Sequence, residues 1–155
     1  MKTLILYTSK HGATLQIANQ ISSHLAESQV VNLKEKIPSL SEFDCIIIGS
    51  PLRAGKISKE VSKFARKNEK ILKEKQLGLF LSGLDEKQEG QYFSSNFSPA
   101  LLEKVKVQMF LGGIYDPEKC NLMERAAMQT AAHLTGYTST ISPDQIEQFV
   151  SLLEN

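Results

Sequence analysis

The sequence predicts an α/β protein in which five parallel strands form one doubly wound sheet, in the order 2-1-3-4-5. Short, continuous apolar runs alternate along the 155 residues with longer amphipathic stretches at helical spacing. The runs are rich in Ile, Leu, Val and Phe, and most are followed by Gly, Ser or Pro. Such runs are typical of strands buried on both faces, as in a parallel sheet.

The apolar runs are the predicted strands. They are too short for helices and show no alternation of polar and apolar residues, so neither face is expected to meet solvent. Right-handed crossovers between them place helices on both faces of the sheet. In chain order the predicted strands are Leu4–Tyr7, Val30–Leu33, Cys45–Gly49, Leu77–Leu81 and Val105–Leu111.

The amphipathic stretches are the predicted helices. Ala13–Glu27 carries its large apolar residues on one side, and Ile57–Leu72 carries lysines opposite its apolar residues. Pro99–Lys104 is a shorter candidate. Asp144–Leu153 is the last helix, and the Ser-Pro pair before it is a plausible helix start.

One segment is longer than a connection between the last strand and the last helix needs to be. Residues 113–142 lie between the fifth strand and the last helix, and a structureless loop of that length would be unusual. Asn121–Leu134 has apolar residues at helical spacing, which predicts an extra helix with a broad apolar face. We therefore expect that the segment is helical or a functional insertion, or both, and describe it as a helical insertion. No linker or repeat divides the chain, so residues 1–155 are expected to form a single domain.

The composition excludes several classes of protein. Apolar residues make up 41% and charged residues 23%, which is ordinary for a globular protein and unlike collagen-like or disordered chains. The formal net charge is only +1, so no overall field attracts nucleic acid or an anionic membrane. No cluster of residues has metal-ligand spacing, and no metal is expected.

The apolar runs of the sequence also predict no targeting signal. The apolar run near Met1 is too short for a signal peptide, and no run is long enough to span a bilayer. The two cysteines, Cys45 and Cys120, lie far apart and suggest a reducing compartment. We therefore expect a cytoplasmic protein.

The strongest candidate site follows the first strand. The backbone N–H groups of this turn and of the helix start are expected to point at one spot, which attracts a phosphate. Walker A and GxGxxG patterns are absent, so a mononucleotide phosphate fits better than a dinucleotide. The alternative is a capped helix after a tight turn. The turn consists of Thr8, Ser9, Lys10, His11, Gly12, Ala13 and Thr14.

Two further loops are expected at the same edge of the sheet. Ligands of open α/β sheets bind outside the carboxyl ends of the strands, at the switch point between the first and third strands. The alternative is that both loops are ordinary strand-to-helix connections, in which Gly and Pro only form turns. Glu86–Phe97 is expected to be a mobile polar loop. The candidate binding residues are Ser50, Pro51, Leu52, Arg53, Ala54 and Gly55 in one loop and Ser82, Gly83, Leu84 and Asp85 in the other.

Together the three loops resemble the flavodoxin family, in which the first loop reads T/S-x-T-G-x-T and holds the phosphate of FMN. Here His11 stands where that pattern has Thr. The run Ile48–Lys56 is similar to the corresponding run in the menaquinone-dependent protoporphyrinogen oxidase branch of this family. That branch has an I-R-x-G core in this loop, and here the four residues are Leu52-Arg53-Ala54-Gly55. Leu111–Tyr115 and the helical insertion after it are also similar, so the resemblance covers nearly the whole chain.

The resemblance implies that FMN is the cofactor and that the three loops bind it. It implies an FMN-dependent oxidoreductase that oxidises a reduced organic substrate by two electrons and passes them to a quinone. In that branch the substrate is protoporphyrinogen, in heme biosynthesis. The alternative is a small flavodoxin that carries electrons between redox partners. A response-regulator-like module is disfavoured, because Gly49-Ser50 ends the third strand where such a module needs an aspartate.

A bound isoalloxazine ring would have defined neighbours. Leu52 is expected to cover one face, and Tyr92 or Tyr115 to stack on the ring. Arg53 or Lys56 is expected near the N1/C2=O edge, where negative charge develops on reduction. The insertion has balanced charges and no Trp, so at most weak membrane association is expected.

Overall fold

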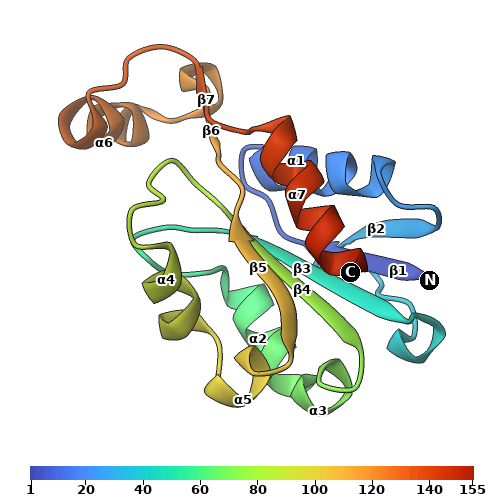
Figure 1. Ribbon diagram of the computed structural model, residues 1–155. Coiled ribbons are helices and arrows are strands. Elements are labelled where there is room, and N and C mark those ends of the chain that lie inside the picture. Colours follow the sequence, from blue (N-terminus) through green and yellow to red (C-terminus); the bar gives the residue numbers. More distant parts are fainter.

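The computed structural model describes residues 1–155 and contains the predicted sheet. Five parallel strands pair in the order β2-β1-β3-β4-β5, which confirms the predicted fold class. Helices cover both faces of this sheet, and one arm of the chain projects beyond its carboxyl edge (Figure 1). The switch point between β1 and β3 therefore lies beneath that arm.

The strands are those that the apolar runs predicted, with small shifts at their ends. β1, β3 and β4 in the centre of the sheet are almost entirely buried, whereas the edge strands β2 and β5 are partly exposed. The register pairs Leu6 with Ile48 and Ile48 with Leu79 across the centre. The strands are β1 (Thr3–Tyr7), β2 (Ser28–Asn32), β3 (Cys45–Pro51), β4 (Gln76–Ser82) and β5 (Val105–Phe110).

Two layers of helices cover the sheet. On one face α1 (Ala13–Ser23) and α7 (Pro143–Glu154) lie side by side and bury Ile17, Ile21 and Phe149 (Figure 1). The other face carries the remaining layer, whose buried residues form a second core with the strands. It consists of α2 (Lys59–Lys67), α3 (Glu69–Leu72), α4 (Glu89–Asn96) and α5 (Pro99–Leu102), and a 3-10 turn (η1, Leu40–Glu42) precedes β3.

Two predicted helices are shorter or broken. The stretch Ala13–Glu27 stops being helical after Ser23, whose hydroxyl donates to the Gln20 carbonyl as the chain turns toward β2. The stretch Ile57–Leu72 divides at Asn68, whose side-chain amide donates to the Phe64 carbonyl. Such local hydrogen bonds compete with the backbone ladder and end helices.

The expectation of a mobile polar loop over Glu86–Phe97 is wrong. This segment contains α4, and its Phe93 is fully buried against the sheet. The Phe93 ring stacks against Phe97 at a centroid distance of 6.3 Å. Two buried aromatic rings thus hold in place a segment whose remaining residues are mostly polar.

The insertion forms an arm on a two-stranded antiparallel ribbon, β6 (Ile114–Tyr115) and β7 (Thr138–Ser139). Between them lie a 3-10 turn (η2, Pro117–Lys119) and α6 (Leu122–Ala132). The predicted helix is present, but the expected apolar face is not buried: α6 has no buried residue, and Met123 is 82% exposed. No helix in the protein has the length and apolar content needed to cross a membrane.

Candidate functional site

A cavity of about 680 Å³ opens at the carboxyl ends of β1, β3 and β4, and residues of α6 line part of it. Its size is within the usual range of small-molecule sites. All the predicted binding residues line it except Thr8, Gly12 and Ser50. The three loops therefore meet at one place, as the position of the switch point requires.

The first loop presents free backbone donors. Gly12 adopts φ +99°, a left-handed conformation suited to glycine, and α1 begins at the next residue. The Gly12 amide donates to Ser9 Oγ at 3.0 Å, whereas the amides of Lys10, His11 and Ala13 have no acceptor within the protein. Unpaired amides at a helix start attract an anion, so the loop fits a phosphate group.

The hydroxyls of the first loop are less available than the sequence suggested. Thr8 Oγ1 lies 2.8 Å from Ser58 Oγ, and Ser58 also caps α2 by accepting from the Val61 amide. Thr14 Oγ1 lies 2.7 Å from Ser82 Oγ, and both residues are buried. These pairs join the first loop to the other two. Thr8 is 3% exposed and faces α2 rather than the cavity.

The second loop is a tight turn. Arg53 and Lys56 exchange two backbone hydrogen bonds of 2.9 Å, and the residues between them, Ala54 and Gly55, have positive φ values of 49° and 76°. This geometry is that of a type I′ turn, in which a non-glycine residue such as Ala54 is unusual. Ser50 is buried beneath the turn, where its Oγ accepts from the Ser58 amide at 2.9 Å.

Asn96 at the end of α4 holds this turn from below. Its side-chain nitrogen donates to the Gly55 carbonyl at 2.9 Å, and its side-chain oxygen accepts from the Ile57 amide at 3.1 Å. Sequence reasoning missed Asn96 because it assigned the segment to a loop. The buried aromatics that flank it at helical spacing were the available signal.

The third loop approaches the base of the insertion closely. The Gly83 amide donates to the Gly112 carbonyl at 2.9 Å, and a Cβ on Gly113 would meet the Gly83 backbone at 2.6 Å. Leu84 lines the cavity and is half-buried, while Asp85 at the rim accepts from the Lys87 amide. Glycine at both positions lets the arm leave the sheet directly beside the cavity.

Aromatic and apolar residues line the other walls. Tyr92 packs against Phe110 at a centroid distance of 6.2 Å, and Tyr115 is buried. Leu52 of the second loop lies beside Gly83 of the third and lines the cavity. A planar ring system could lie among Leu52, Tyr92 and Tyr115. Lys56, which was expected near the ring edge, is not part of the cavity wall.

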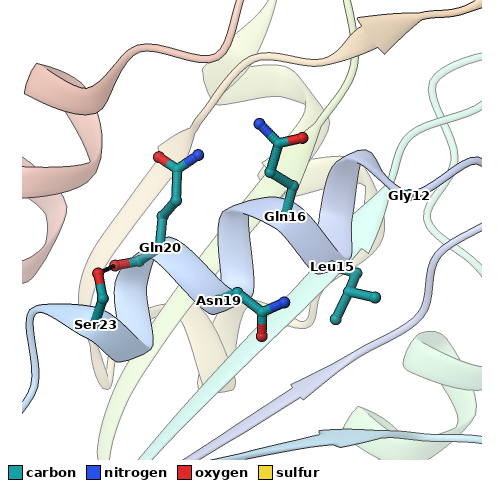
Figure 2. A pocket seen from close by; sticks show the side chains of 6 residues that line it. All are labelled: Gly12, Leu15, Gln16, Asn19, Gln20 and Ser23. Atoms are coloured by element: carbon teal, nitrogen blue, oxygen red, sulfur yellow. Dashed lines mark hydrogen bonds between the residues drawn. The ribbon is translucent and has the colours of Figure 1, made fainter.

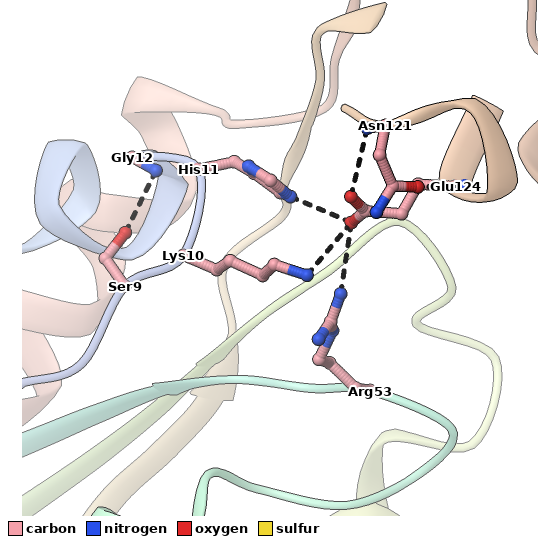
Figure 3. A network of polar contacts seen from close by, with 7 residues as sticks. All are labelled: Ser9, Lys10, His11, Gly12, Arg53, Asn121 and Glu124. Atoms are coloured by element: carbon pink, nitrogen blue, oxygen red, sulfur yellow. Dashed lines mark hydrogen bonds and ion pairs between the residues drawn. The ribbon is translucent and has the colours of Figure 1, made fainter. Parts of the chain in front are cut away.

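A cluster of charges links the first two loops to α6 (Figure 3). The single oxygen Oε2 of Glu124 accepts from Lys10 Nζ at 3.2 Å, His11 Nε2 at 3.0 Å and Arg53 Nη2 at 3.1 Å. The other oxygen, Oε1, accepts from the Asn121 amide, which completes a capping box at the start of α6. Arg53 is thus directed at Glu124.

These contacts keep Glu124 ionised. The hydrogen bond from His11, followed by those from the Asn121 backbone and Lys10, lowers the pKa of Glu124 to about 2. Cys120 lies nearby, and partial burial together with the Glu124 charge raises the pKa of its thiol. Sequence reasoning missed Glu124, because nothing in the pattern of the insertion marks it as a site residue.

The same cluster contains three groups of metal-ligand type. The ligand atoms of His11, Cys120 and Glu124 lie within 4.8 Å of one another, which sequence spacing did not predict. However, Lys10 and Arg53 already contact the Glu124 oxygen that a cation would need. Two fixed positive charges disfavour a metal ion at this place.

A second hollow, of about 430 Å³, runs along the outer side of α1 (Figure 2). Its lining residues are Gly12, Leu15, Gln16, Asn19, Gln20 and Ser23, none of which is titratable. It joins no other cluster of reactive side chains, so it is not the candidate site.

Comparisons with solved structures agree with this fold. Oxidised flavodoxin 1 from Bacillus cereus superposes with a TM-score of 0.63 at 16% identity, covering 99% of this chain and 97% of that one. A Fusobacterium nucleatum flavodoxin bound to flavin mononucleotide gives 0.54 at 16%, covering 99% and 98%. Rubredoxin oxygen:oxidoreductase from Desulfovibrio gigas gives 0.57 at 15%, covering 99% of this chain but only 34% of that one.

The sequence comparisons identify the family. Among curated proteins no relative matches the sequence. A family model described as Flavodoxin domain matches residues 4–142, which include the five strands, apart from the first residue of β1, and the whole insertion. The match spans most of the chain, and the protein therefore belongs to the flavodoxin domain family.

Proposed function

We propose that the protein binds FMN in this cavity and carries electrons between redox partners. The observation that carries the proposal is the first loop, where unpaired amides of Lys10, His11 and Ala13 meet the start of α1 at the edge of the cavity. Membership of the flavodoxin family supports it, as does the Fusobacterium nucleatum flavodoxin of the same fold, whose structure contains flavin mononucleotide. Bound FMN supplies the one- and two-electron redox chemistry.

Different residues of the protein would bind the phosphate and the ring of FMN. The amides of the first loop, the Ser9 hydroxyl and the Thr14 hydroxyl, which can accept from Ser82 and donate to a ligand, would hold the phosphate dianion. The dipole of α1 would add to its binding. Leu52 and the two tyrosines Tyr92 and Tyr115 would flank the ring and limit its contact with water. The roles of these residues stay predictions, as does a cytoplasmic location.

A second candidate is an FMN-dependent oxidoreductase with an organic substrate and a quinone-type acceptor. The observation in its favour is the position of α6, whose residues Ala127, Met128, Ala131 and Ala132 line one wall of the cavity. A wall of this kind leaves room for a small substrate beside a bound cofactor. No comparison supports the protoporphyrinogen oxidase branch, so we rank the electron carrier first.

Binding of FMN and of riboflavin, measured by quenching of flavin fluorescence, tests the proposal. We expect FMN to bind and T14V to weaken FMN by about tenfold, since a hydrogen bond to a charged group contributes ~1.5–3 kcal/mol, while riboflavin changes much less. T130V on the exposed side of α6 is the matched control and should change neither. Equal losses for both flavins would place the phosphate elsewhere, and absence of FMN binding would refute the proposal.

Redox titration of the flavin-loaded protein separates the two candidates. An electron carrier should take up its electrons in two resolved one-electron steps. An oxidoreductase acting on an organic substrate should be reduced in one two-electron step and reoxidised by added quinone. Reduction in a single step with rapid quinone turnover would reverse our ranking.

A further inference from the structure

The carboxylate of Glu124 lies where a ligand's anionic group would fit. Three donors from two separate loops, Lys10, His11 and Arg53, converge on one of its oxygen atoms within 3.2 Å (Figure 3). All four side chains line the cavity. The chain's own carboxylate thus shows that this arrangement of donors accommodates an oxyanion.

The cluster has more positive charge than Glu124 neutralises. Lys10 and Arg53 each carry a fixed positive charge, His11 adds a further donor, and Glu124 supplies a single negative charge. The Lys119 ammonium also lies over Gly12, beside the same loop. An incoming dianion would therefore be attracted to these donors more strongly than Glu124 is.

The contacts of Glu124 are also what holds α6 in place. Every side-chain hydrogen bond and ion pair between α6 and the loops ends on this residue. No residue of α6 is buried, and the helix is attached to the sheet through the short β6–β7 ribbon. An 11-residue helix without packing is marginal in water, so α6 depends on this attachment.

We propose that Lys10, His11 and Arg53 form an oxyanion site, that Glu124 occupies it in the absence of ligand, and that an oxyanion displaces Glu124 and releases α6 from the cavity. The oxyanion is a phosphate or carboxylate group, either that of FMN or that of a second ligand beside it. This inference goes beyond the proposed function. Of the two measurements that test it, only the one with FMN and riboflavin rests on the proposed function.

The first measurement uses flavin-free protein and inorganic phosphate. Hydrogen exchange of the amides of residues 122–132 is compared in sodium phosphate and in sodium chloride of equal ionic strength. In the wild type, phosphate should speed this exchange by about threefold or more, since the exposed contacts to Glu124 are individually weak and their loss loosens α6 only modestly. E124Q should exchange fast in both salts. E118Q changes an exposed glutamate of the same arm and is expected to behave like the wild type.

The second measurement identifies the source of the oxyanion. If the phosphate of FMN uses the site, E124Q should tighten FMN binding about two- to fivefold and leave riboflavin unchanged. If the site serves a second ligand, E124Q leaves both flavins unchanged, and phosphate still speeds α6 exchange in the FMN-loaded wild type. Weaker FMN binding by E124Q would mean that Glu124 positions the cations for FMN, which would overturn the proposal.

Three other results would also overturn it. They are no effect of phosphate on α6 exchange in the wild type, equal effects in E118Q and E124Q, and equal tightening of both flavins by E124Q. Failure of the protein to bind any flavin would refute the proposed function alone. The response of α6 to inorganic phosphate would still decide the inference.

Discussion

One residue in the core, Cys45, makes stability depend on pH in the alkaline range. Cys45 at the start of β3 is fully buried, and burial raises the pKa of its thiol from 9.0 to about 11. The unfolded chain therefore loses this proton at lower pH than the folded protein does. Between these two values the unfolded state binds fewer protons, so the free energy of unfolding falls as the pH rises. Below pH 9 the thiol makes no such contribution.

We expect this fall to be absent from C45A. Between pH 9 and 11 the wild type should lose ~2 kcal/mol of unfolding free energy more than the variant does. Urea unfolding at intervals of half a pH unit measures both curves. Lysine and tyrosine titration affects both proteins equally, so parallel curves would show that the thiol does not contribute.

At the scale of elements, α4 supports the binding loop that it underlies. Asn96 is the residue through which it acts, because its side chain pairs with both Gly55 and Ile57. Substitution by alanine leaves a part-buried carbonyl and a part-buried amide without partners. N96A should therefore cost about 1–3 kcal/mol of unfolding free energy and weaken FMN binding through the loosened turn.

The matched control for this prediction is N68A. Asn68 also lies at the end of a helix on the same face, but its side chain makes only one local hydrogen bond, to Phe64. Its loss should cost less, and FMN binding should be unchanged. Urea unfolding and flavin titration of both variants provide the comparison, and equal effects would argue against a role of Asn96 in holding the loop.

At the scale of the whole molecule, the sheet carries two hydrophobic cores, one on each face. β3 contributes to both, with Ile46 and Ile48 on one side and Cys45 and Ile47 on the other. Because central strands share their backbone hydrogen bonds with both neighbours, neither core can be lost alone. We propose on this ground that residues 1–155 form one domain.

Two probes of unfolding test the single domain. Far-ultraviolet circular dichroism follows the helices on both faces, and tyrosine fluorescence follows the four tyrosines, of which Tyr7 and Tyr115 are buried. The protein has no tryptophan, so this tyrosine signal is not masked. The two urea transitions should coincide. Two separated transitions would indicate that the insertion or one helical layer unfolds independently.

Local patterns predicted the parts of the fold that depend on neighbouring residues. Continuous apolar runs predicted the five strands and their order, and the turn at residues 8–14 predicted a loop that presents free amides at the start of α1. The same approach failed for α4, because its buried rings are few among polar residues. It predicted α6 as a helix, but not that the apolar residues of this helix lie exposed on an arm.

By itself the sequence determined the sheet, its order and the edge at which the loops gather, since burial of apolar strands and the handedness of crossovers follow from local pattern. Only the tertiary structure decided which side chains meet there. Lys10 and Glu124 are 114 residues apart, and no periodicity connects them. Their contact depends on the direction in which the β6–β7 ribbon carries α6, which is set by long-range packing around Gly83 and Gly113.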